Sequence, residues 1–146
     1  MTTRHADPRV QRVIDLFEHL RPEHVAQLGR WYTDDARFKD PFNEVQGVPP
    51  IQRIFRHMYE TLDEPRFVIR DAIAEGDQAF LSWDFLFRMR RFDRREQCVR
   101  GGSQLRFAPD GRIADHRDYW DVAEELYEKL PVLGALMRWL KRRAMA

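Results

Sequence analysis

The segment from Trp31 to Gly47 reads Trp-Tyr-Thr-Asp-Asp-Ala-Arg-Phe-Lys-Asp-Pro-Phe-Asn-Glu-Val-Gln-Gly. We expect its first two residues to end a helix, because the polar side chains of Thr33 to Asp35 bond the local backbone and favour turns. Residues 36–39 can then run as a short strand. Pro41 disfavours the helical conformation at Asp40. The segment therefore predicts a carboxylate held at a strand end, with the rest of the chain as walls around it.

Composition sets the class of protein. A chain of 146 residues, 43% hydrophobic and 34% charged, is expected to form one globular domain over residues 1–146. A net charge of +1 gives no general attraction to nucleic acid. Cys98 is the single cysteine, so no internal disulfide can form, which is typical of a reducing, cytoplasmic location. No apolar run is long enough for a membrane span.

Helical spacing of apolar residues dominates the first 62 residues. Asp7 followed by Pro8 is a typical helix start, since aspartate caps well and proline fits the first helical position. A second helix is expected from Pro22 through Tyr32. A third is expected to start at Pro49 and to end at the Asp-Glu-Pro sequence of residues 63–65.

From Arg66 onward the apolar period changes to two, which indicates strands. Gly101 and Gly102 predict a bulge or a sharp bend in the third of these strands. Three helices followed by sequential antiparallel strands predict an α+β fold, a cone-shaped curved sheet wrapped around the helices. The expected strands are residues 67–74, 78–91, 97–107 and 112–120.

A helical extension is expected after the last strand, over residues 121–146. Asp121 caps a helix that runs to Leu130, and Pro131 starts another. Residues 132–143 of this second helix are amphipathic and end in a cluster of cations. We expect the helix to pack on the sheet or on a partner subunit, and we do not expect membrane contact through it.

The order of these elements resembles a known superfamily. A helix ending in Tyr-x-Asp-Asp-Ala, a short strand, Asp-Pro and a loop to glycine before a helix resembles the nuclear transport factor 2-like proteins. The ketosteroid isomerase and SnoaL-like polyketide cyclase branch is the most similar, from Val10 to Trp120. The superfamily includes isomerases, cyclases, dehydratases, epoxide hydrolases and binding domains, so the resemblance implies the fold more strongly than the activity.

The resemblance gives Asp40 a catalytic role, because the matching aspartate of ketosteroid isomerase is its general base. A structural role, bonding the amides of its own loop, stays open beside it. The isomerase also needs a tyrosine and a protonated aspartic acid as an oxyanion hole. Leu16 and Ser103 occupy those positions here. Because losing one such donor typically costs about 100–1000-fold in rate, these residues argue against a steroid isomerase.

The last strand offers a different acid/base unit. Alternation places His116, Asp118 and Trp120 on one face. In the isomerase the matching positions line the cavity, and the first two are apolar there. A histidine beside a carboxylate near an apolar wall is suited to proton transfer. A satisfied polar pair, or a face turned toward a dimer interface, is the alternative.

The walls of the expected pocket come from helices and strands together. Phe17, Phe55 and Trp83 should supply the apolar surface, and Ser103, Tyr32 and Trp120 should contact a ligand. Trp83 belongs there if the odd face of strand 78–91 points inward, whereas the even face would present Asp84. The apolar odd face favours the first arrangement, with Asp84 in an interface or an ion pair.

These residues predict a domain that binds a small apolar or polycyclic molecule. The chemistry would be cofactor-free acid/base catalysis by Asp40, His116 and Asp118, of isomerase, cyclase, dehydratase or hydrolase type. A non-catalytic ligand-binding or protein-interaction domain is the alternative. Histidines without zinc-ligand spacing, and the absence of a glycine-rich phosphate loop, predict no metal and no cofactor. A sheet with apolar residues on both faces predicts a homodimer.

Overall fold

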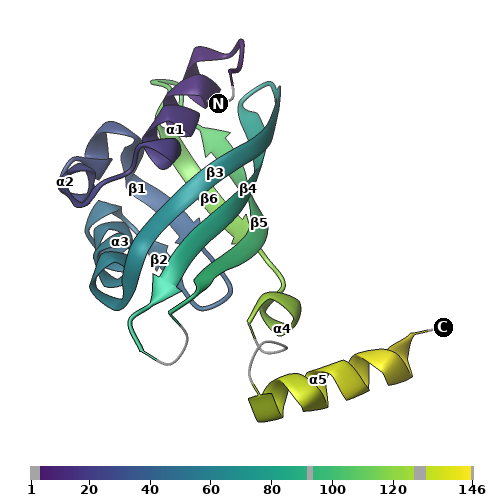
Figure 1. The fold of residues 1–146 in the computed structure, drawn as a ribbon. Coiled ribbons are helices and arrows are strands. Elements are labelled where there is room, and N and C mark those ends of the chain that lie inside the picture. The colour runs from purple at the N-terminus through teal and green to yellow at the C-terminus, as the bar shows by residue number, and fades with distance from the viewer. Residues whose placement is uncertain (1–3, 92–93, 127–130, 146) are drawn as a thin grey trace.

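The fold is a curved sheet with helices on one face (Figure 1). The computed structural model describes residues 4–91, 94–126 and 131–145. Within them six strands form one sheet in the order β2-β1-β6-β5-β4-β3, antiparallel except where β1 runs parallel to β6. The predicted α+β cone with N-terminal helices and a C-terminal helix is thus confirmed. The helices are α1 (Pro8–Glu18), α2 (Pro22–Val25), the 3-10 helix η1 (Leu28–Arg30), α3 (Val48–Thr61), α4 (Val122–Glu125) and α5 (Pro131–Ala144). The strands are β1 (Tyr32–Lys39), β2 (Glu44–Gln46), β3 (Leu62–Glu75), β4 (Gln78–Met89), β5 (Glu96–Phe107) and β6 (Ile113–Tyr119).

The start of α1 is fixed by the residues that predicted it. The Asp7 carboxylate accepts a hydrogen bond from the Arg9 backbone N–H at 2.9 Å, and Pro8 fills the first helical position. The Arg9 guanidinium also reaches Asp77 at 2.7 Å, in the turn between β3 and β4. The helix is therefore joined to the far end of the sheet, and its apolar stripe packs on the inner face.

The second predicted helix is much shorter than expected, and the turn predicted at Thr33 to Asp35 is wrong. The helix divides into α2 and η1, and Tyr32 begins β1 instead of ending a helix. Tyr32 and Ile113 are partners in the parallel pair of β1 and β6, with an irregularity before Arg37. Strand β6 pairs with β1 on both sides of these polar residues, at Tyr32 and again from Arg37 onward, so the segment between the two paired positions stays extended.

Strand β3 begins five residues earlier than expected. The sequence at Asp63 to Pro65 predicted the end of the helix, but α3 ends at Thr61 and these residues lie in the strand. Glu64 has a positive φ of 52°, and the register of β3 on β4 shifts between Asp63 and Arg66. The residues predicted to break the helix therefore form an irregularity of the bulge type at the start of β3.

The orientation of β4 follows its apolar alternation. Ala79, Leu81 and Trp83 are buried on the inner face. Asp84, on the outer face, is ion-paired with Arg70 of β3. The predicted inward odd face and the ion pair are both confirmed.

The two glycines of β5 do not form the predicted bulge, because β4 and β5 keep their register through Gly101 and Gly102. They make room for aromatic rings instead. A Cβ atom at Gly101 would lie 2.9 Å from a ring carbon of Trp83 and 2.9 Å from the Tyr119 carbonyl oxygen. A Cβ atom at Gly102 would meet the ring of Phe80. Both positions allow close approach of neighbouring groups.

The C-terminal extension contains the two expected helix starts. Asp121 caps α4, accepting a hydrogen bond from the Glu124 N–H at 3.1 Å, while the predicted end at Leu130 lies outside the described residues. Helix α5 projects away from the sheet (Figure 1), so packing on the sheet is not seen. Its apolar residues Val132 and Leu136 are exposed. No described helix combines the length and apolar character needed to cross a membrane.

Candidate functional site

A cavity of about 290 Å³ lies between the inner face of the sheet and helices α1 and α3. Its lining is mostly aromatic and aliphatic, with a few polar side chains among them, which is the usual form of a small-molecule site. All three candidate catalytic residues line it: Asp40, His116 and Asp118. The aromatic rings of the lining are Phe17, Phe38, Phe55, Phe67, Trp83, Phe85, Phe87 and Trp120.

A continuous chain of hydrogen bonds runs along the wall of this cavity. The Tyr32 hydroxyl is 2.7 Å from His116 Nδ1, and His116 Nε2 is 2.6 Å from Asp118 Oδ1. Ser103 donates to the same Asp118 oxygen at 2.5 Å, and the Trp83 indole N–H donates to Ser103 Oγ at 2.9 Å. Four strands, β1, β6, β5 and β4, thus contribute one or two members each.

The chain of bonds determines where the protons lie. Because the Trp83 N–H occupies Ser103 Oγ as an acceptor, the Ser103 hydroxyl is free to donate to Asp118. A neutral His116 with its proton on Nε2 donates to Asp118, and its Nδ1 then accepts the hydrogen bond of the Tyr32 hydroxyl. Both donors match an ionised carboxylate, which only accepts.

Tyr32 and His116, the inner members of this series of hydrogen bonds, are buried among aromatic rings. Tyr32 is fully buried and His116 is 2% exposed. The His116 ring lies 4.7 Å from the ring of Phe38 and stacks parallel to Tyr32 at 5.9 Å. Burial, and secondarily the negative charge of Asp118, raise the pKa of Tyr32 well above its ordinary value. Tyr32 therefore keeps its proton and acts as a donor.

Asp118 is the member of this hydrogen-bonded series whose carboxylate is partly exposed in the cavity. Its side chain is 17% exposed and lines the cavity. Oδ1 holds both hydrogen bonds, and no described residue donates to Oδ2. The carboxylate therefore has one fixed oxygen and one oxygen available to a ligand.

Asp40 lies at the end of β1, as predicted, and its carboxylate binds the loop that follows. Oδ1 accepts hydrogen bonds from the backbone N–H of Phe42 at 2.8 Å and of Asn43 at 2.6 Å, and the Asn43 side chain bonds both oxygens. Because Lys39 pairs with Arg117, the next residue on each parallel strand brings Asp40 beside Asp118. Asp40 combines a loop-bonding role with a place in the cavity wall.

The structure brings together most of the residues that the sequence suggested for the pocket. Phe17, Phe55, Trp83, Ser103 and Trp120 all line the cavity. Tyr32, expected to contact a ligand, is not in the lining and lies behind His116. The sequence missed Phe38, Ile54, His57, Met58, Thr61, Leu62, Phe67, Phe87, Val99 and Leu126. Their apolar period was visible, but only the curvature of the sheet selects the ones that face the cavity.

Metal ligands are a separate question. Among the residues that the structure describes, no group of three or more histidine, cysteine, aspartate or glutamate side chains could hold a metal ion.

The class of protein follows from solved structures that share this cone. A ketosteroid isomerase-like protein from Catenulispora acidiphila, in complex with trimethylamine, has a TM-score of 0.70 at 15% identity, covering 84% of this chain and 92% of that chain. TsrD from Streptomyces laurentii has a TM-score of 0.67 at 21% identity, covering 90% and 99%. A protein described as a SnoaL-like polyketide cyclase from Shewanella denitrificans has a TM-score of 0.68 at 18% identity, covering 82% and 98%. At such identities the likeness shows the fold alone, which is nuclear transport factor 2-like.

A match to a family model is more specific than a match of fold. Residues 10–116 match the model of the SnoaL-like domain. The chain belongs to this family, as its Asp-Pro junction and strand order suggested. No curated protein matches the chain.

Proposed function

We propose that the cavity binds a small, largely apolar molecule and that Asp118, with His116, transfers a proton to or from it without a cofactor. The observation that supports this most directly is the asymmetry of the Asp118 carboxylate. Oδ1 is held by Ser103 and His116, and Oδ2 has no described donor. A positioned base inside an apolar wall is the arrangement that acid/base catalysis requires.

Each residue then has a distinct role. Asp118 Oδ2 takes a proton from the ligand and returns it at another atom, or gives it to a leaving group. His116 and Ser103 keep the carboxylate in place and supply hydrogen bonds to its charged form. The aromatic wall excludes water, which strengthens the charged interactions in the cavity. Asp40 is the second carboxylate and an alternative base.

The names of similar proteins are compatible with this range of reactions. Neighbours are described as SnoaL-like polyketide cyclases and, from Agrobacterium tumefaciens, as an isomerase of the SnoaL-like family. Isomerisation, cyclisation, dehydration and epoxide hydrolysis can each use a carboxylate as the general acid or base, so we propose this group of reactions without choosing among them. The Leu16 and Ser103 positions still argue against steroid isomerisation.

The test is proton exchange with solvent. The protein in D₂O is mixed with a panel of one- and two-ring ketones, epoxides and amines, and hydrogen loss or ring opening is followed by NMR. Asp118→Asn should reduce any turnover by at least about 100-fold while leaving binding measurable. Asp84→Asn is the matched control, because Asp84 lies on the opposite face in an ion pair with Arg70.

The outcomes separate the candidate bases. Loss of turnover in Asp40→Asn, with Asp118→Asn active, would move the base to Asp40. Binding of panel members in the cavity with no chemistry in the wild-type protein would favour the second candidate function, a ligand-binding domain. That candidate is supported by the use of the Asp40 carboxylate in its own loop.

We also propose a homodimer and a cytoplasmic location. The outer face of the sheet presents exposed Ile73 and Phe80 at one hollow and Tyr119 at another, and exposed apolar residues of this kind are typical of an interface. The single cysteine, Cys98, fits a reducing compartment.

A further inference from the structure

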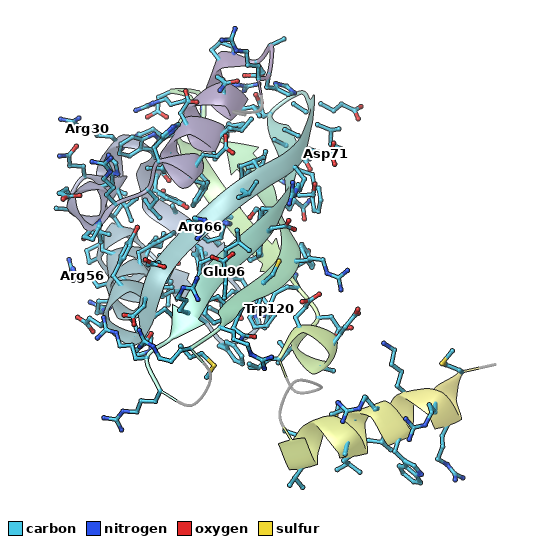
Figure 2. The ribbon with its side chains drawn as sticks, viewed as in Figure 1. Arg30, Arg56, Arg66, Asp71, Glu96 and Trp120 are labelled. Atoms are coloured by element: carbon cyan, nitrogen blue, oxygen red, sulfur yellow. The ribbon has the colours of Figure 1, made fainter. Side chains whose placement is uncertain are left out.

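The acidic side chains described in the cavity lining are not matched there by a described lysine or arginine. Among the residues that the structure describes, the lining holds two carboxylates, Asp40 and Asp118, two histidines, and neither lysine nor arginine. The chain is otherwise rich in arginine, but those side chains lie elsewhere. Figure 2 shows Arg30 and Arg56 at the periphery of the molecule, and Arg66 is ion-paired with Glu96 at 3.0 Å.

His116 does not supply the missing positive charge. The single hydrogen-bond partner described for the Tyr32 hydroxyl is His116 Nδ1. If both ring nitrogens of His116 carried protons, the buried Tyr32 O–H would have no acceptor, and leaving such a group unsatisfied is costly. With this assignment, the donors described for the Asp118 carboxylate, His116 and Ser103, are both neutral, and no described lysine or arginine lines the cavity beside it.

The aromatic cavity wall also favours a positively charged ligand. Eight aromatic rings line the cavity, and the faces of such rings attract cations, more strongly where water is excluded. The two hydroxyl groups described in the lining are already used as donors. Ser103 already donates to Asp118, and the Thr61 hydroxyl donates to the His57 carbonyl oxygen at 2.7 Å.

We infer that the occupant of this cavity carries a positive charge: it is a small organic cation, a protonated tertiary amine or a quaternary ammonium with an apolar body. The inference rests on the proposed binding function and narrows its ligand class. The cation would lie against the aromatic wall, with Asp118 Oδ2 as its counter-charge. A cavity of about 290 Å³ is at the small end for such sites, which indicates a body of one or two rings.

The experiment compares two molecules of nearly the same shape. Phenyltrimethylammonium carries a charge, and tert-butylbenzene replaces its nitrogen with carbon. Binding of each to the full chain is followed by quenching of tryptophan fluorescence, since Trp83 and Trp120 line the cavity. We expect the cation to bind at least tenfold more tightly. Equal or tighter binding of tert-butylbenzene would overturn the inference.

Two variants locate the effect. Asp118→Asn should remove most of the preference for the cation and leave the affinity for tert-butylbenzene unchanged. Asp84→Asn makes the same change on the outer face and should preserve the preference. A preference that survives Asp118→Asn but falls in Asp84→Asn would contradict the assignment. If Asp118→Asn fails to fold, the comparison of the two molecules on the wild-type protein still decides the inference.

The results also separate this inference from the proposed function. Selective cation binding without proton exchange in D₂O would remove the catalytic proposal and keep the inference. Binding of tert-butylbenzene alone would keep the apolar site and overturn the inference. If neither molecule binds in the cavity, both are overturned.

Discussion

At the scale of single residues, His116 is the point where the fold and the candidate chemistry meet. It packs among Phe17, Phe38 and Tyr32, and it bonds Asp118 at the cavity wall. A substitution of Tyr32, at the buried end of the hydrogen-bonded series, should therefore alter His116 and, through it, the Asp118 carboxylate in the cavity.

Tyr32→Phe tests that connection. The variant removes the hydroxyl that donates to His116 Nδ1 at 2.7 Å. The neutral imidazole ring can then carry its single N–H proton on either nitrogen. We expect the ¹⁵N chemical shifts of His116 to change from one tautomer to a mixture. The free energy of unfolding should fall by about 1 kcal/mol, the usual net value of one hydrogen bond.

Tyr119→Phe is the matched control, because the Tyr119 hydroxyl lies on the outer face, 3.4 Å from Gln104. It should leave both the His116 shifts and the stability unchanged. Unchanged His116 shifts in Tyr32→Phe would show that Asp118 alone fixes the tautomer.

At the scale of elements, the sequence predicted what depends on local periodicity. The apolar alternation of β4 correctly gave its inner face, and the Asp7-Pro8 pair correctly gave the start of α1. It did not predict that Tyr32 starts a strand, because the partner of Tyr32 is Ile113, 81 positions further along the chain. The same holds for the site: alternation joined His116 to Asp118, but only the fold reveals Tyr32 behind them.

Strand β5 gives a prediction about packing. Gly101→Ala would place a Cβ atom 2.9 Å from the carbonyl oxygen of Tyr119 and against the Trp83 ring. We expect a loss of about 1–3 kcal/mol in the free energy of unfolding, typical of overpacking, measured by urea denaturation. Gly29→Ala is the control, because nothing lies within 4 Å of its added Cβ. Equal effects of the two substitutions would mean that the glycine contacts do not limit the packing of β5.

The start of α1 should be sensitive to pH. Hydrogen bonds from Arg9 lower the pKa of Asp7 to about 2, from an ordinary 3.8. A lowered pKa means that the ionised form stabilises the fold above about pH 4, and that this contribution is lost as the pH falls toward 2. Asn also caps helices well, so Asp7→Asn isolates the charge. The wild-type Tm should exceed that of Asp7→Asn at pH 7, and the two should converge near pH 2. A difference that persists at pH 2 would assign the effect to capping geometry.

At the scale of the whole molecule, two apolar surfaces stay exposed among the residues that the structure describes. One is the outer face of the sheet, where Ile73 is 67% exposed. The other is α5, where Leu136 is 51% exposed. Either could join two copies, but the sheet face carries two hollows that a partner could fill, so we assign the proposed homodimer to it.

Sedimentation of the wild-type protein at micromolar concentration should show a species near twice 17.6 kDa. Ile73→Glu places a charge in the proposed interface, and burying an unpaired charge is costly. We therefore expect this variant to sediment as a monomer with an unchanged circular dichroism spectrum. Leu136→Glu makes the equivalent change on α5 and should remain dimeric. A monomer in Leu136→Glu with a dimer in Ile73→Glu would move the interface to the C-terminal helix, and a wild-type monomer would leave both surfaces open to other partners.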